Sequence, residues 1–185
     1  MAGRAGCWFT YNDGTDGGVQ TPPQGAQCPP SVIPDGGFCG GQYAQHTFGG
    51  GFFNFGAGLG FDLNDTSPPR KPYDASKYQG LVFWALAPQG TTALPLGVDL
   101  QVLESATTPT TSGGTCTSAT GCNDHYQIQL NFTSQWTAFT VPFSCLTQQS
   151  WGTQVSLDLT TLLGIQFVVN PAPAFDFWIY DIGFY

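Results

Sequence analysis

Residues 126–143 read YQIQLNFTSQWTAFTVPF, and this stretch decides the fold class. In its first half every second residue is apolar, from Tyr126 to Phe132, and the residues between them are polar. Successive side chains of an extended strand point to opposite faces, so this alternation places one apolar face against a core and one polar face outside it. Residues 137–143 repeat the pattern with Phe139, Val141 and Phe143. The stretch therefore predicts two half-buried β-strands.

The same period of two recurs along the whole chain, separated by clusters rich in Gly and Pro. The expected strands cover residues 8–11, 42–48, 59–63, 80–87, 96–103, 126–132, 137–143, 163–170 and 175–184. Helix is expected only as single turns near 145–149 and 158–162. No repeat of solenoid or propeller length is present. The pattern predicts an all-β fold, an antiparallel β-sandwich of jelly-roll type that forms one domain over residues 1–185.

The charge distribution excludes several classes of partner. Four Lys and Arg against twelve Asp and Glu give a net charge of −8, and no cation follows Lys77. Nucleic acids and anionic membranes both require clustered positive charge, so neither is an expected partner. The sequence contains no apolar run long enough to cross a bilayer and no signal peptide. Its opening, MAGRAGCW, is interpreted as an expression start on a fragment of a longer secreted protein.

Six cysteines in a chain poor in Lys and rich in Thr and Gly indicate an oxidising, extracytoplasmic compartment. Cys116 and Cys122 close a short Gly- and Thr-rich loop, which favours a local disulfide. Cys28 with Cys39 closes a second loop, and elimination leaves Cys7 with Cys145. A zinc site is the alternative, but the chain has no CxxC pair and its two His lack metal-ligand spacing.

Four segments together are similar to a known family: WFTYNDGTDGG (8–18), KPYDASKYQGLVFWALA (71–87), QWTAFTVPFSCL (135–146) and FDFWIYDIGFY (175–185). In this order they resemble the galactose-binding-like jelly-roll superfamily, which includes many carbohydrate-binding modules of secreted bacterial proteins. The resemblance spans nearly the whole chain and implies a β-sandwich that binds carbohydrate.

The resemblance also implies a structural Ca²⁺ between the N-terminal region and the last strand. By that resemblance Asp181 is the first ligand candidate, with Asn12, Asp13 and Asp16 as partners from the loop after the first strand. Carboxylate oxygens are ligands that Ca²⁺ prefers. The alternative for this loop is a turn in which Asn and Asp side chains bond their own backbone.

Sugar binding on a β-sandwich uses exposed aromatic rings, which stack on the apolar face of a pyranose. Trp151 is the first candidate because it lies in the loop TQQSWGT, outside any alternation. Tyr126 and Tyr73, next to loop segments, are the others. The alternative for each is an aromatic lid on the core. Trp84 and Trp178 lie within apolar strand patterns and are expected to be structural.

Two strand faces carry the polar groups that bind sugar hydroxyls. Gln127 and Gln129 share the polar face of residues 126–132, and Asp99 and Gln101 share the polar face of residues 96–103. If the two strands lie in one sheet, the four side chains form a hydrogen-bonding surface suited to neutral polysaccharide. The alternative is an ordinary solvated outer face.

The expected function is a non-catalytic carbohydrate-binding module of a secreted or cell-surface protein, which keeps the other domains of its parent chain near a polysaccharide. One alternative is a self-assembling structural or adhesive subunit. The other is a polysaccharide-degrading enzyme, in which Asp99 and Asp124 would act as acid and base. Adjacent Asp124 and His125 on an extended segment would point to opposite faces, which disfavours a catalytic triad.

Overall fold

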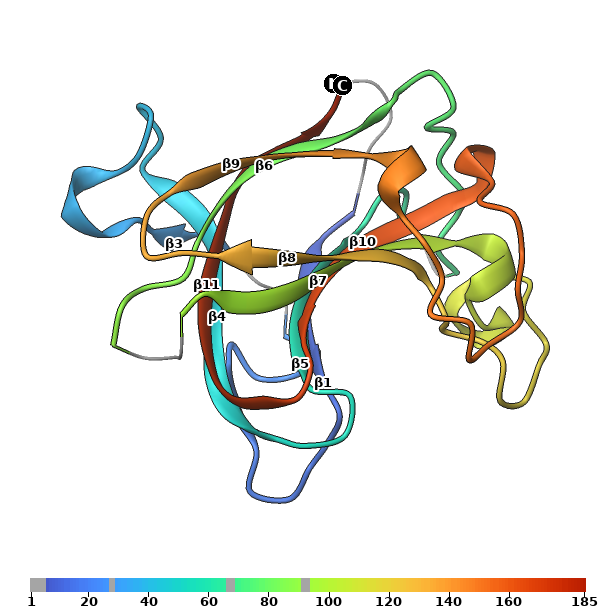
Figure 1. The fold of residues 1–185 in the computed structure, drawn as a ribbon, viewed down its shortest axis with the longest axis horizontal. Coiled ribbons are helices and arrows are strands. Elements are labelled where there is room, and N and C mark those ends of the chain that lie inside the picture. Colours follow the sequence, from blue (N-terminus) through green and yellow to red (C-terminus); the bar gives the residue numbers. More distant parts are fainter. Residues whose placement is uncertain (1–5, 27–28, 66–68, 91–93) are drawn as a thin grey trace.

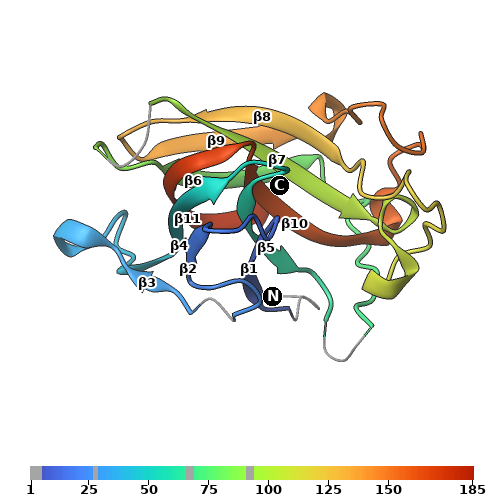
Figure 2. The ribbon, with the colours of Figure 1, turned by 90° about the horizontal axis from the view of Figure 1, so that it is seen from below.

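Two antiparallel β-sheets face each other in the computed structural model, which describes residues 6–26, 29–65, 69–90 and 94–185 (Figures 1 and 2). One sheet has five strands in the order β1-β5-β10-β7-β8, and the other has six, in the order β2-β4-β11-β6-β9 with β3 paired to β4. The strands are β1 (Trp8–Asn12), β2 (Val19–Thr21), β3 (Ser31–Val32), β4 (Tyr43–Phe52), β5 (Ala57–Asp62), β6 (Gly80–Leu86), β7 (Leu96–Glu104), β8 (Tyr126–Phe132), β9 (Thr137–Pro142), β10 (Leu162–Val169) and β11 (Ala172–Phe184). The prediction of an all-β antiparallel sandwich is confirmed.

Helical structure in the described residues consists of 3₁₀ turns of three residues each. They are η1 (Pro34–Gly36), η2 (Ser105–Thr107), η3 (Thr110–Ser112), η4 (Phe143–Cys145) and η5 (Leu159–Thr161). No helix within the described ranges combines the length and apolarity needed to cross a membrane.

The core lies between the two sheets and contains the apolar half of each alternating strand. Leu59, Phe167 and Leu100 form one row across β5, β10 and β7, and all three are fully buried. Burial of each such side chain contributes about 1.5–3 kcal/mol to folding. Because alternate residues face away from this core, the same strands present a second set of side chains on the outer face of the five-stranded sheet.

A second, smaller cluster closes the outer face of the six-stranded sheet. Phe38, from the segment between β3 and β4, stacks on Trp136 with 4.9 Å between ring centroids and meets Trp84 edge-on. Trp178 belongs to the same cluster and is buried. Trp84 and Trp178 are therefore structural, as the sequence predicted.

Two long connections lie side by side at one end of the molecule, on the right of Figure 1. One runs from η2 to the start of β8, and the other runs from η4 to η5. The amide of Thr153 donates a hydrogen bond of 2.9 Å to the carbonyl of Gly121, which joins the two. These connections form the walls of the site described below.

All nine expected strands are present, with ends that differ by a few residues. The sequence missed the short strands β2 and β3 and the extension of β4 through three glycines to Phe52. Gly50 is required there because a Cβ on it would lie 2.3 Å from the carbonyl oxygen of Pro173 on the neighbouring β11. Close approach of two backbones explains Gly49 and Gly50, whereas Gly51 has a φ of +83°, which favours glycine.

The disulfide predictions have a mixed outcome. Cys116 and Cys122 are bonded, as expected. Cys145 is an exposed free thiol, so the expected bond with Cys7 is wrong. Cys7 precedes β1, and Cys145 lies beside the segment that pairs with β8. Strands β1 and β8 are the two edges of the five-stranded sheet, about 19 Å apart at the usual strand spacing, which is too far for a disulfide.

The other expected pair, Cys28 with Cys39, is not formed either. Cys39 is a free thiol in the exposed turn closed by two hydrogen bonds between Phe38 and Gly41. Cys28 lies outside the described residues. The pairing predicted by elimination was wrong because it assumed that every cysteine forms a disulfide within the chain.

Candidate functional site

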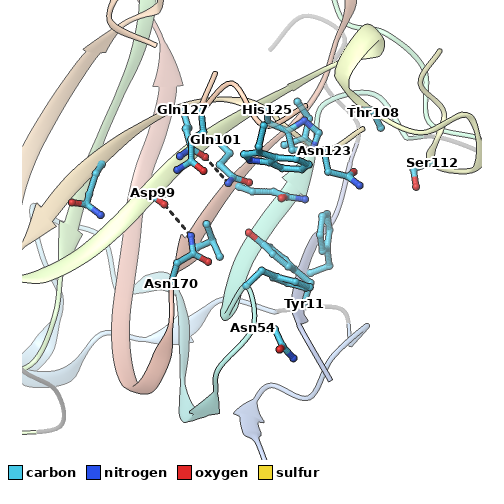
Figure 3. Close-up of a pocket in the computed structure, with 18 of the residues that line it drawn as sticks. Tyr11, Asn54, Asp99, Gln101, Thr108, Ser112, Asn123, His125, Gln127 and Asn170 are labelled. Atoms are coloured by element: carbon cyan, nitrogen blue, oxygen red, sulfur yellow. Dashed lines mark hydrogen bonds between the residues drawn. The ribbon is translucent and has the colours of Figure 1, made fainter. Parts of the chain in front are cut away.

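The outer face of the five-stranded sheet carries a cavity of about 840 Å³, here called the groove (Figure 3). This volume lies within the usual range for ligand sites, roughly 300–1,000 Å³. The residues that line the groove are Phe9, Tyr11, Asn54, Phe55, Arg70, Asp99, Gln101, Leu103, Thr108, Ser112, Asn123, His125, Gln127, Gln129, Gln149, Trp151, Gln166, Val168 and Asn170. Polar amides and aromatic rings predominate, which is the mixture that binds sugars.

The floor of the groove on β7 and β8 is a row of hydrogen-bonding side chains. Strands β7 and β8 are neighbours, with Asp99 opposite Gln129 and Gln101 opposite Gln127. Gln101 Nε2 donates a hydrogen bond of 2.9 Å to Gln127 Oε1, which fixes the orientation of both amides. Gln166 of β10 lies opposite Gln101 and extends the row across a third strand. The predicted surface on a shared sheet is therefore present.

Two aromatic rings complete the floor because strand β5 has glycine at two successive positions of this face. Gly60 and Gly58 of β5 are paired with Phe9 and Tyr11 of β1. A Cβ on Gly58 would lie 2.6 Å from the Tyr11 ring, and a Cβ on Gly60 would lie 3.0 Å from the Phe9 ring. The two rings therefore lie across β5, in space that a larger residue would occupy.

The hydroxyl of Tyr11 is buried and has no hydrogen-bond partner among the described residues. Its side chain projects from β1 toward the middle of the groove (Figure 3). Burial, together with the nearby charge of Asp99, raises the pKa of Tyr11 well above its ordinary value, so the phenol remains protonated. A buried donor without a partner costs free energy.

One end of the groove lies at the turn between β4 and β5, where Phe55 is 53 % exposed. Asp13 holds this turn, because its Oδ2 accepts hydrogen bonds from the amides of Asn54 and Gly56 at 2.8 and 2.9 Å. Desolvation acts to raise the pKa of Asp13, but its hydrogen bonds outweigh that effect and lower the pKa from 3.8 to about 2. Close to this end, Asn170 Nδ2 donates a bond of 2.9 Å to the Asp99 carboxylate.

The other end of the groove is formed by Trp151, whose side chain is 55 % exposed. Its loop is held by the buried Asp124, whose carboxylate accepts hydrogen bonds from the amides of Gln149 and Gly152 at 2.9 and 3.0 Å. Gln154 Nε2 adds a third bond at 3.1 Å. An exposed tryptophan on a loop fixed from below is pre-organised for stacking.

The charged groups near Trp151 are largely neutralised. Arg70 Nη1 lies 2.5 Å from the Asp62 carboxylate. His125 is buried, with Nδ1 2.8 Å from Thr107 Oγ1. Its burial, and then the charge of Arg70, lower the pKa of His125 from 6.5 to about 4 against the opposing effect of Asp124, so the imidazole is neutral near pH 7.

Five of the seven predicted ligand-binding residues line the groove: Asp99, Gln101, Gln127, Gln129 and Trp151. Tyr126 does not, because it pairs with Val102, a core residue, and its hydroxyl donates to the carbonyl of Val155 at 2.6 Å. Tyr73 is also elsewhere, stacked on Phe184 with 5.7 Å between ring centroids. The alternative that these two aromatics pack on the core is correct for both.

Five further lining residues were not predicted from the sequence: Phe9, Tyr11, Phe55, Gln166 and Asn170. A signal for the first two was present, because Phe9 and Tyr11 lie on either side of Thr10 and Gly58 and Gly60 lie on either side of Leu59. Glycine within a strand often marks a place where a neighbouring group approaches closely. The pattern becomes informative only once β1 and β5 are known to be paired.

The predicted calcium ligands do not come together. Asp13 and Asn12 use their side-chain oxygens to cap their own loop, including bonds from the amides of Thr15 and Gly14, so the alternative of an Asx turn is the correct one. Ala172, the first residue of β11, pairs with Phe52 beside this loop. Asp181 lies near the other end of the same strand, about 30 Å from Ala172. Asp16 is exposed. Within the described residues no group of three His, Cys, Asp or Glu side chains could hold a metal ion, and these four residues do not fit a Ca²⁺ site.

Comparisons with known proteins find similarity in structure only. No protein-family model and no curated protein sequence matches the chain. The family 11 carbohydrate-binding module of a cellulosomal cellulase of Clostridium thermocellum is similar with a TM-score of 0.60 and 14 % identity, over 96 % of this chain and 86 % of that one. A second structure of a family 11 module from this organism, in complex with a β-1,3-1,4-mixed-linked tetrasaccharide, has a TM-score of 0.55 and 15 % identity, over 97 % and 96 % of the chains.

A third similar structure is the family 30 carbohydrate-binding module of another cellulosomal cellulase of Clostridium thermocellum. Its TM-score is 0.53 at 14 % identity, over 96 % of this chain and 95 % of that one. At these identities the similarity concerns the fold, and the chain has the β-sandwich fold of these modules.

Proposed function

We propose that this chain is a non-catalytic carbohydrate-binding module and that the groove binds a neutral polysaccharide. One observation carries the proposal: the buried hydroxyl of Tyr11 has no partner among the described residues and faces a groove that also presents Asp99 and eight glutamine and asparagine side chains. Partners with both donors and acceptors, such as sugar hydroxyls, match this set. The two exposed aromatic side chains, Phe55 and Trp151, supply stacking surfaces at its ends.

The electrostatics of the groove favour a neutral glycan over an acidic one. Arg70 is paired with Asp62, which leaves the Asp99 carboxylate as the charge on the groove floor. The whole chain carries a net charge of −8. An anionic polysaccharide would be repelled by both the local and the overall charge.

Hydrolysis by a carboxylate pair is less well supported. The usual mechanism needs two carboxylic groups on either side of the scissile bond. Among the described residues, Asp99 is the one carboxylate that lines the groove. Asp124, the other candidate, is buried and already accepts three hydrogen bonds from the Trp151 loop.

We also infer that the domain acts outside the cytoplasm, as one part of a longer secreted protein. The disulfide between Cys116 and Cys122 supports an oxidising compartment. The similar modules belong to cellulosomal cellulases of Clostridium thermocellum, which supports the same arrangement of a binding module beside other domains.

A depletion and affinity-electrophoresis panel of neutral and acidic polysaccharides, with product analysis on the same samples, tests the proposal. Mixed-linked β-1,3-1,4-glucan is the first probe because a similar fold was solved with its tetrasaccharide. We expect retention by at least one neutral polysaccharide without new reducing ends. Retention by none contradicts the proposal, and product release makes the protein an enzyme. Self-association without glycan retention would favour the structural alternative.

Variants locate the binding in the groove. Trp151→Ala, and separately Gln127→Ala with Gln129→Ala, should lower the affinity roughly tenfold or more, since a few side chains carry most of the binding energy of a site. Tyr43→Ala and Gln135→Ala are matched controls, because both residues are exposed and lie outside the groove. The melting temperature should remain close to that of the unaltered protein in all four.

A further inference from the structure

A second hollow of about 480 Å³ lies on the far side of Trp151, here called the outer hollow. Its walls are the residues around the disulfide: Pro109, Thr110, Thr111, Cys116, Thr117, Ser118, Ala119, Thr120, Cys122 and Asn123, with Trp151. Trp151 and Asn123 line both the groove and the outer hollow. The two cavities therefore meet at a shared wall formed by one exposed indole ring and one amide.

The walls of the outer hollow are fixed rather than loose. The Cys116–Cys122 disulfide closes the loop, and inside it the Ser118 hydroxyl accepts a hydrogen bond of 2.9 Å from the amide of Gly121. The loop base is tied to η2 by the amide of Asn123, which donates to the carbonyl of Thr107 at 2.7 Å. A surface held in this way can bind a ligand without first paying the entropy of ordering itself.

The chemistry of the outer hollow matches that of the groove. Its polar side chains are hydroxyls and one amide, and none of its lining residues is charged. Thr117 and Thr120 are exposed, so their hydroxyls are accessible to a ligand. An uncharged, hydroxyl-rich hollow beside an exposed tryptophan suits a further sugar unit better than an ion or an apolar group.

We propose that the outer hollow is an additional glycan subsite, which takes the sugar units of a neutral polysaccharide that continues past Trp151 from the groove. This inference rests on the proposed function of the groove. Trp151 then contacts the glycan from both cavities. The protein should accordingly bind internal stretches of a long chain more tightly than short oligosaccharides.

Filling the outer hollow tests the subsite. Ala119→Phe places a large side chain in its wall, and Ala138→Phe is the matched control on the exposed side of β9, away from both cavities. Titration calorimetry would measure the affinities of both variants and of the unaltered protein for mixed-linked β-1,3-1,4-glucan, its octasaccharide and its tetrasaccharide. Thr117→Ala with Thr120→Ala is a second, milder variant that removes two exposed hydroxyls.

We expect the unaltered protein to bind the octasaccharide and the glucan roughly tenfold more tightly than the tetrasaccharide. Ala119→Phe should abolish this gain while leaving the affinity for the tetrasaccharide unchanged, and Ala138→Phe should retain it. The subsite is wrong if the unaltered protein, Ala119→Phe and Ala138→Phe all gain the same affinity with the longer saccharides, or if the unaltered protein gains none. Either result leaves the groove as the proposed binding site. Absence of binding to all three saccharides by the unaltered protein overturns the groove as a site for this glucan, and the subsite with it.

Discussion

The side chain that distinguishes this groove from an ordinary solvated sheet face is Tyr11. An exposed polar face would hydrogen-bond to water, whereas the Tyr11 hydroxyl is buried over Gly58 and finds no partner among the described residues. Removal of this one hydroxyl should therefore maintain or raise the stability of the fold and weaken the binding of a ligand.

Tyr11→Phe should leave the free energy of unfolding unchanged or raise it by up to about 1 kcal/mol, because it removes an unsatisfied buried donor. The same change should weaken polysaccharide binding about tenfold. Denaturant unfolding and calorimetry measure the two effects. Tyr126→Phe is the control, since that hydroxyl is bonded to the Val155 carbonyl and lies outside the groove. It should lose stability and keep its affinity, and the reverse pattern in the two variants would be inconsistent with this role for Tyr11.

His125 should make stability depend on pH. Its pKa falls from 6.5 to about 4 because it is buried, so the folded state stays unprotonated while the unfolded state takes up a proton. The free energy of unfolding should decrease as the pH falls from about 6.5 to about 4, by on the order of 3 kcal/mol. Denaturant unfolding across this window, compared with His125→Gln, checks the sign. Parallel curves for the two proteins would show that His125 does not titrate in this way.

At the scale of the elements, the loop that carries Trp151 is anchored by a carboxylate from the residues just before β8. Asp124 accepts two backbone hydrogen bonds and one from Gln154, all from residues 149–154. Trp151 itself is exposed and contributes little to holding the loop. The position of the stacking ring is thus set by a residue that does not line the groove.

Asp124→Ala should lower the free energy of unfolding by about 1–3 kcal/mol, because it removes the buried acceptor of three hydrogen bonds. It should also weaken glycan binding, and hydrogen exchange at the Gln149 and Gly152 amides should become faster. Asp158→Ala is the matched control: Asp158 accepts from the amide of Thr160 in the same way, but outside the groove. Unchanged exchange at Gln149 and Gly152 in Asp124→Ala would contradict the anchoring role.

The elements also show what the sequence could and could not predict. The alternation in β7 and β8 identified Asp99, Gln101, Gln127 and Gln129, because one face of a strand is defined by spacing alone. Phe9 and Tyr11 were missed because their place on the floor depends on the glycines of β5, fifty residues away. Asp124 was missed as an anchor because its bonds reach a loop about 25 residues later in the chain.

For the whole molecule, the disulfide closes a short loop between Cys116 and Cys122. In the chain-entropy description, closing seven residues contributes about 2 kcal/mol to stability. Cys116→Ala with Cys122→Ala should lower the free energy of unfolding by about this amount and make residues 117–121 sensitive to proteolysis. Cys145→Ala is the control, because that thiol is free. An equal effect of both changes would contradict a role specific to the disulfide.

The two faces of the sandwich have different roles. On the six-stranded sheet, Phe38 and three tryptophans cover the outer surface, whereas the outer surface of the five-stranded sheet remains hollow and lined with amides. The sequence could predict the sandwich because alternation recurs in every strand. It could not show whether Asp181 lies near the loop of Asn12, Asp13 and Asp16, or which cysteines are close enough to pair, because both depend on which strand edges and ends are near each other.

The most direct test of the central claim is a map of backbone and side-chain amide chemical shifts during titration with the glycan that the panel retains. If the groove binds the glycan, the chemical shifts of the Trp151 indole and of four side-chain amides should change saturably: Gln101, Gln127, Gln129 and Asn170. The amides around Trp84 and Trp178, on the other sheet, should not shift. Shifts confined to the six-stranded sheet, or none in the groove at saturating glycan, would contradict the claim that the five-stranded sheet binds carbohydrate.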